Sequence, residues 1–233
     1  MMRTTMDVVW PPPINNPVGH AVLYWEIFCP PRVAPMLRSR GRCRSFDLET
    51  DWDLSRSASR WSALFWDLQA CVKFTLLCPP CTYWTPLRAS NWLRMPVEQR
   101  ESYASDGIWF LLLSVAIAKY QDDHGNYYML EHPAKSTMWN RLEVMSLRGE
   151  CVEFDMCMMG LATPKSHTPL KKATNIKTNL KLFADQFRNK KCDNTHKHVE
   201  VQSTFEGVKL STYSQIYPQP MCKAIADVVG RLT

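Results

Sequence analysis

The chain has 233 residues, of which 45% are hydrophobic and 21% charged, and this composition excludes an intrinsically disordered protein. A net charge of +6 is too small to identify a nucleic-acid-binding protein by itself. Nine irregularly spaced cysteines, with no apolar signal segment before them, predict free thiols in an intracellular protein of the nucleus or cytoplasm. The longest apolar run, residues 108–118, is too short to cross a bilayer, so no membrane partner is expected.

The pattern along the chain predicts an α/β protein. Residues 1–20 are rich in proline and predict a flexible lead-in, followed by one domain over residues 21–233. Apolar runs of strand length, several ended by prolines, predict strands over residues 21–28, 43–48, 72–78, 127–130, 151–156 and 173–179. Apolar residues at helical spacing, together with end signals, predict helices over residues 33–40, 55–69, 107–121, 139–147, 180–187 and 217–229. Residues 85–106 are expected to form a long loop, and the alternation of elements favours a mainly parallel sheet flanked by helices.

One short segment carries a candidate nucleophile. The strand that starts at Val72 must end at Pro79, because proline cannot donate to a sheet ladder. Cys81 therefore lies just past the carboxyl end of a strand, at the edge where open α/β sheets bind ligands. Three other predicted strands end in acidic residues: Glu26, Asp47 and Glu131. Each acid alone is more simply a helix cap or a solvated loop residue, but parallel strands would bring all four groups to one crevice.

These residues, in this order, resemble the motifs of the DNA cytosine-5 methyltransferases, from about Tyr24 to the end of the chain. Glu26-Ile27-Phe28 is similar to the first motif, which holds S-adenosylmethionine. Asp47 stands where the family has the acid that binds the cofactor ribose, and Asp53 resembles the acid near the adenine. Pro80-Cys81 resembles the motif with the catalytic thiol, and Glu131-His132-Pro133 stands where the family has Glu-Asn-Val. The stretch from Tyr217 to Ala226 resembles the closing motif. The residues of these motifs are most similar to those of divergent methyltransferase-like domains in retroelement polyproteins.

The resemblance implies a Rossmann-like, S-adenosylmethionine-dependent methyltransferase fold and methylation of C5 of cytosine in DNA. In that chemistry the thiolate of Cys81 adds to C6 of the base, and Glu131 supplies a proton at N3. The cofactor-binding residues implied are Glu26, Phe28, Asp47, Asp53, Pro80 and Tyr217. The substrate-binding residues implied are Thr82, Trp84, Arg88 and Arg94. The target base must leave the duplex to reach the site. The loop over residues 82–106 is expected to form a lid, and the arginines of this loop are expected to bind phosphates and to lower the pKa of the Cys81 thiol. Other segments of a polyprotein are further expected partners.

Some residues depart from the family pattern. Cys29-Pro30-Pro31-Arg32 replaces the glycines that follow the first motif, and Asp155-Met156-Cys157 stands roughly where a Gln-Arg-Arg strand is usual. The segment between the fifth strand and the last helix is too short for a separate target-recognition domain. The competing hypothesis is therefore a catalytically degenerate methyltransferase-fold module that binds nucleic acid or acts as a scaffold.

Two further groups of cysteines leave alternatives open. Cys78-Pro79-Pro80-Cys81 is also a C-x-x-C sequence, but the residues after it do not begin the helix that a thioredoxin-like redox motif requires. The side chains of Cys192, His196 and His198, with Cys157 as a fourth, are the types that bind zinc, although their spacing is not a common finger pattern. A basic surface loop with exposed histidines, next to Lys190, Lys191 and Lys197, is the simpler interpretation. Trp84 is equally suited to stacking on a flipped base and to core packing.

Overall fold

The computed structural model describes residues 22–47, 50, 52, 54, 72–86 and 92–232. Within them, six strands form one sheet in the order β2-β1-β3-β4-β7-β5. The strands are β1 (Val22–Ile27), β2 (Arg42–Phe46), β3 (Phe74–Leu77), β4 (Tyr127–Pro133), β5 (Glu150–Asp155) and β7 (Ala173–Thr178). β2, β1, β3 and β4 are mutually parallel, whereas β7 runs antiparallel to both β4 and β5. The predicted α/β class and the mainly parallel sheet are thus confirmed.

The strand sequences explain this order. All six residues of β1 and all four of β3 are buried, as expected for central parallel strands that are covered on both faces. In β7 only every second residue is buried, which is the pattern of a strand with one face in the core. The six predicted strands therefore correspond to six observed ones, with ends that differ by a few residues.

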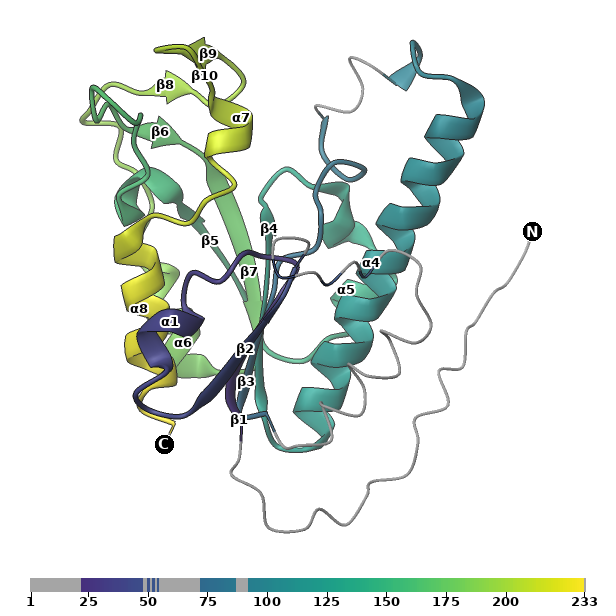
Figure 1. Ribbon diagram of the computed structural model, residues 1–233, viewed down its shortest axis with the longest axis vertical. Helices are drawn as coiled ribbons and strands as arrows, with labels where there is room; N and C mark the ends of the chain where they lie inside the picture. The colour runs from purple at the N-terminus through teal and green to yellow at the C-terminus, as the bar shows by residue number, and fades with distance from the viewer. Residues whose placement is uncertain are drawn as a thin grey trace.

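Helices cover both faces of the sheet. α4 (Val97–Asp123) lies on one face, and α1 (Ala34–Leu37), α6 (Lys181–Arg188) and α8 (Gln219–Val229) lie together on the other (Figure 1). Neighbouring residues of β1 point into different cores: Tyr24 packs with residues of α6 and α8, and Trp25 packs with residues of α4. The alternation of side chains along a strand thus supplies both layers with aromatic packing.

α4 differs most from the prediction. It begins at Val97 rather than near residue 107, so the second half of the expected loop over residues 85–106 is helical. Position 107, inside this helix, is a glycine because Tyr83 packs directly against it. A Cβ there would lie 2.6 Å from the Tyr83 Cβ. The expected helix over residues 139–147 is instead two single turns, η3 (Thr137–Asn140) and α5 (Leu142–Met145).

Short elements fill the chain between β5 and α8. They are η4 (Met156–Met159), β6 (Leu170–Lys171), β8 (Val199–Glu200), β9 (Thr204–Phe205), β10 (Val208–Lys209) and α7 (Leu210–Tyr213). This overhang, residues 156–213 without β7 and α6, rises beyond the sheet on one side while the first half of α4 rises on the other (Figure 1). Among the described residues, no helix has the length and apolar character needed to cross a membrane. The expected lead-in over residues 1–20 and the expected helix over residues 55–69 lie outside the described residues.

Candidate active site

The candidate residues gather at the carboxyl edge of the parallel strands. β1 pairs with β2 on one side and with β3 on the other, so the strand order reverses here, and such a switch point is where open α/β sheets bind ligands. Asp47 follows β2 and Cys81 follows β3, while Glu26 and Glu131 lie in the carboxyl-terminal halves of β1 and β4. The expectation that these four residues share one edge is confirmed.

Glu26 holds the loop after β1 in place. Its side chain is fully buried, and its two oxygens accept hydrogen bonds from the backbone N–H groups of Arg32 (3.1 Å), Val33 (3.1 Å) and Ala34 (3.3 Å). The Ser45 hydroxyl donates a further bond of 2.6 Å. Burial raises the pKa of Glu26, and these hydrogen bonds oppose the rise. Glu26 therefore shapes the loop that would face a cofactor, and its own oxygens are already occupied.

Asp47 and Phe28 lie at the ends of the neighbouring strands. The N–H of Phe28 donates to the carbonyl of Phe46 (2.9 Å), and Phe28 has a left-handed backbone with φ of 64°. Asp47 is half-buried, and its backbone turns back through bonds of 3.0 Å with both the N–H and the hydroxyl of Thr50. Phe28 packs edge-on against Phe110 of α4, with 5.2 Å between ring centroids. Asp53, expected near the adenine, lies outside the described residues.

Tyr217 joins the two central strands to the end of the chain. Its hydroxyl donates to Oε2 of Glu131 (2.9 Å) and lies 3.0 Å from Sγ of Cys78. The ring is only 7% exposed. Cys78 also interacts with Cys29, whose pKa is raised by that interaction and by burial. Tyr217 therefore lies beside Glu131 and Cys78, and its expected contact with a cofactor stays a prediction.

Glu131 is a buried acid with one free oxygen. Burial raises its pKa, while the nearby Lys172 ammonium and the Tyr217 hydrogen bond lower it. Among the described residues, its Oε1 has no hydrogen-bond partner. An unpartnered buried carboxyl oxygen is costly, and it marks a position where a ligand donor or acceptor would be stabilised.

Cys81 lies within electrostatic range of both Glu131 and Lys172. Burial raises the pKa of the Cys81 thiol; Lys172 lowers it and Glu131 raises it. The net direction is upward, so the expectation of a lowered pKa is wrong for this protein. Arg88, one of the arginines expected to lower it, lies outside the described residues, and Arg94 is exposed in the turn before α4. The cation that acts on the thiol is Lys172, which sequence reasoning missed.

Lys172 reaches the site because of the sheet topology. It lies between β6 and β7, and β7 starts opposite the carboxyl end of β4, with Thr174 paired to Pro133. The Lys172 Nζ donates to the carbonyl of Ser214 (3.0 Å), which directs the side chain across the edge. In sequence, Lys172 is one of two adjacent lysines in a polar segment, so no local pattern distinguishes it.

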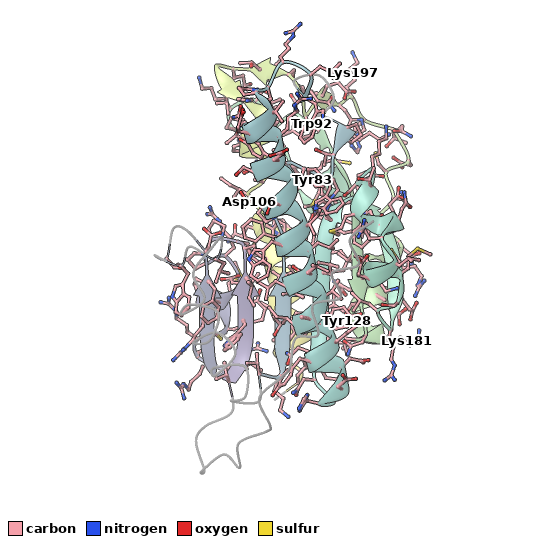
Figure 2. The ribbon with its side chains drawn as sticks, turned by 90° about the vertical axis from the view of Figure 1, so that its right-hand side faces the viewer. Tyr83, Trp92, Asp106, Tyr128, Lys181 and Lys197 are labelled. Atoms are coloured by element: carbon pink, nitrogen blue, oxygen red, sulfur yellow. The ribbon has the colours of Figure 1, made fainter. Side chains whose placement is uncertain are left out.

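The residues that follow Cys81 form a turn. The N–H of Trp84 donates to the carbonyl of Cys81 (3.0 Å). The Trp84 indole is 6% exposed and donates to the carbonyl of Gly107 (3.2 Å), so of its two expected roles the structure shows core packing. Thr82 is exposed at the same turn, and Figure 2 shows Tyr83 beside the middle of α4.

His132, next to the acid, is neutral. Burial and the Lys172 charge lower its pKa to about 3, and the backbone carbonyl of Pro80 raises it in smaller part. The imidazole therefore lies near the backbone of Pro80, and neither ring nitrogen has a hydrogen-bond partner among the described residues. Pro80 itself is exposed, and its expected contact with the cofactor stays a prediction.

The two remaining cysteine groups are separated by the structure. Cys78 faces Tyr217 and Cys29, whereas Cys81 faces Lys172 and Glu131, so the two thiols of the C-x-x-C sequence have different partners and the redox interpretation loses support. The four candidate zinc ligands do come together, away from this site.

Comparison with known proteins adds nothing to these assignments: no protein-family model matches the chain, and no curated protein matches it significantly.

Proposed function

We propose that this chain is an S-adenosylmethionine-dependent methyltransferase that modifies C5 of cytosine in DNA, with Cys81 as the nucleophile and Glu131 as the acid. The observation that carries the proposal is the convergence of a thiol, an ammonium group and a buried carboxyl with a free oxygen at the carboxyl edge of the sheet. These are the groups that addition of a thiol to a pyrimidine ring requires.

The fold supports this proposal. The parallel strands follow the order β2-β1-β3-β4, and the antiparallel β7 lies between β4 and β5. A reversed strand at this place fits a methyltransferase form of the Rossmann-like fold better than a dinucleotide-binding form, whose sheet is mostly parallel throughout.

The reaction begins with a covalent bond between the protein and the base. Cytosine C5 is a poor nucleophile until a thiolate adds to C6, because this addition breaks the C5–C6 double bond and leaves an enamine across C4 and C5. Burial raises the pKa of Cys81, so the thiol must lose its proton to solvent water as the base binds, and Lys172 favours the resulting thiolate. The raised pKa of Glu131 favours the protonated carboxyl, and its proton passes to N3 of the ring as the S–C6 bond forms.

The cofactor fit is partial. Asp47, at the end of β2, is the type and position of residue that accepts hydrogen bonds from ribose hydroxyls. Phe28, half-buried at the end of β1, offers a ring surface on the same edge. When bound, S-adenosylmethionine supplies an electrophilic methyl group for C5. The backbone N–H groups of residues 32–34 would hold none of it, because they donate to Glu26.

That last observation favours a second candidate function. If the prolines after Cys29 and the occupied N–H groups exclude the cofactor, the chain is a catalytically degenerate methyltransferase-fold module that binds nucleic acid or organises a polyprotein. Such a module keeps the sheet and the Tyr217 contacts but binds no S-adenosylmethionine.

Covalent trapping separates the two candidates. The full chain is incubated with S-adenosylmethionine and DNA that contains 5-fluorocytosine, and the adduct is measured by denaturing electrophoresis. We expect an adduct with the native chain and with Cys151→Ser, whose thiol is exposed on β5, but none with Cys81→Ala. Glu131→Gln should slow adduct formation by about 10²–10⁴-fold, the usual contribution of a positioned acid.

Titration of S-adenosylmethionine by calorimetry completes the test. Cofactor binding without an adduct would overturn the cytosine mechanism while leaving a methyltransferase. Failure of both measurements would overturn the enzyme and support the degenerate module.

A further inference from the structure

Four potential metal ligands meet in the overhang, outside the candidate active site. Cys157 lies in η4 just after β5, and the other three lie in the segment between α6 and β8: Cys192, His196 and His198. Their ligand atoms all lie within 4.8 Å of one another, and all four side chains are half-buried. Two thiols and two imidazoles are the ligand types of structural zinc sites.

The distances match a tetrahedral site. Sγ of Cys192 lies 3.4 Å from Nε2 of His198 and 3.6 Å from Nε2 of His196. With Zn–S bonds of about 2.3 Å and Zn–N bonds of about 2.0–2.1 Å, a tetrahedral ion separates S and N ligands by roughly 3.5 Å. Both imidazoles present the same nitrogen to one sulfur, and a thiol has only one proton to offer. A shared cation explains this convergence better than hydrogen bonding between neutral groups does.

The backbone around Cys192 is arranged to hold a thiolate. The N–H of Asn194 donates to Sγ of Cys192 (3.3 Å) from a left-handed residue with φ of 60°. The N–H of Cys192 donates to the buried carboxylate of Asp155 (2.9 Å). Asp155 precedes Cys157 by two residues, so one acid fixes the relative position of both cysteines. Residues 189–198 contain no helix or strand, and their position depends on such side-chain contacts.

We propose that Cys157, Cys192, His196 and His198 bind a structural zinc ion. Four protein ligands complete a tetrahedral coordination shell, so this site leaves no open position for a substrate and differs from a catalytic zinc site. The ion ties the segment after α6 to the end of β5. The proposal does not depend on methyl transfer, because it uses none of the residues of the candidate active site.

The site has two structural consequences. It holds Lys197 at the end of the molecule where Trp92 and the first turns of α4 lie, far from Tyr128 at the base of β4 (Figure 2). It also fixes Met156, whose N–H donates to the carbonyl of Lys172 (2.9 Å). Zinc therefore orders both the basic segment of the overhang and the strand entry that carries the active-site cation.

Metal content of the full chain is the direct test. The protein is purified under reducing conditions, dialysed against zinc, passed through a desalting column and analysed by mass spectrometry of the elements. We expect one zinc ion per chain. Removal of a ligand in Cys192→Ala or His198→Ala should weaken zinc binding at least about 100-fold, since even the outer partners of metal ligands contribute 10–100-fold. The matched controls Cys151→Ser and His167→Ala change exposed side chains and should keep the metal.

Cobalt substitution keeps the test valid if a variant fails to fold. Co²⁺ in the native chain should give the intense visible bands of a tetrahedral site and a thiolate charge-transfer band in the near ultraviolet. His198→Cys should retain the ion and strengthen the charge-transfer band, because it adds a third thiolate. A native chain that binds no zinc after loading, a cobalt spectrum without the thiolate band, or full zinc binding by Cys192→Ala would each overturn the proposal.

Discussion

Replacement of Tyr217 by phenylalanine tests the link between the last helix and the site. The variant keeps the buried ring but loses the hydroxyl that donates to Glu131 and contacts Cys78. Leaving a buried carboxyl without this partner costs roughly 1–3 kcal/mol. For a domain of this size, each kcal/mol lowers the melting temperature by about 2–4 °C. We therefore expect Tyr217→Phe to melt about 2–12 °C below the native chain.

The deficit should also depend on pH. The Tyr217 hydrogen bond lowers the pKa of Glu131, which burial raises, so the variant has the higher pKa of the two folded proteins. A raised carboxyl pKa contributes stability at low pH that is lost as pH rises through the folded value. Glu131 of the folded variant therefore keeps its proton to a higher pH, and the variant loses more stability than the native chain as the pH rises. The difference in melting temperature between the two proteins should be larger at pH 8 than at pH 4.5.

Thermal unfolding followed by circular dichroism, with reductant present, measures both effects. Tyr103→Phe is the matched control, because Tyr103 is an exposed tyrosine on α4, and it should melt with the native chain at both pH values. Equal melting temperatures for Tyr217→Phe and the native chain, or a deficit that shrinks as the pH rises, would refute the reasoning.

Two further changes test the fold and the site. Gly149→Ala should destabilise the chain by about 3 kcal/mol, because Gly149 has φ of 101° and a Cβ there would overlap the Thr178 carbonyl. The control Gly125→Ala, at φ of 67° with open space around it, should cost only about 1 kcal/mol. Equal urea midpoints for the two variants would contradict this prediction. Lys172→Met should raise the pKa of Cys81, since Lys172 lowers it, and so slow iodoacetamide alkylation of the Cys81 peptide several-fold at pH 8. Lys177→Met is the control and should be alkylated at the native rate. An unchanged alkylation rate in Lys172→Met would count against the ammonium–thiol interaction.

The sheet and its edge could be predicted from the sequence because their signals are local. Continuous apolar runs ended by prolines mark β1 and β3, and the fully buried residues of these strands confirm that interpretation. The same runs also show where each strand ends, and so predict that Glu26, Asp47 and Glu131 lie near the ends of their strands. The first turns of α4 could not be predicted in this way, because residues 97–106 are mostly exposed and lack the apolar stripe that identifies a packed helix.

The rest of the site depends on contacts between distant residues. Lys172 enters through the antiparallel β7, and sequence order alone does not reveal that this strand inserts between β4 and β5. Trp84 looks the same in sequence whether it faces a base or Gly107, and only the packing of α4 decides between them. The four zinc ligands span residues 157–198, and no common finger spacing announces them because β7 and α6 lie between the first ligand and the others.

The hydroxyl of Tyr217 also bears on the order in which the candidate site is assembled. A chain emerging from the ribosome can pair β1, β3 and β4 once residue 133 is free, and so bring Cys78 and Glu131 side by side. Tyr217 follows Glu131 by 86 residues and Cys78 by 139. We therefore expect a nascent chain to hold Cys78 and Glu131 without their common partner until Tyr217 docks. The contacts that Tyr217 makes with both groups can form only after residue 217 has been synthesised.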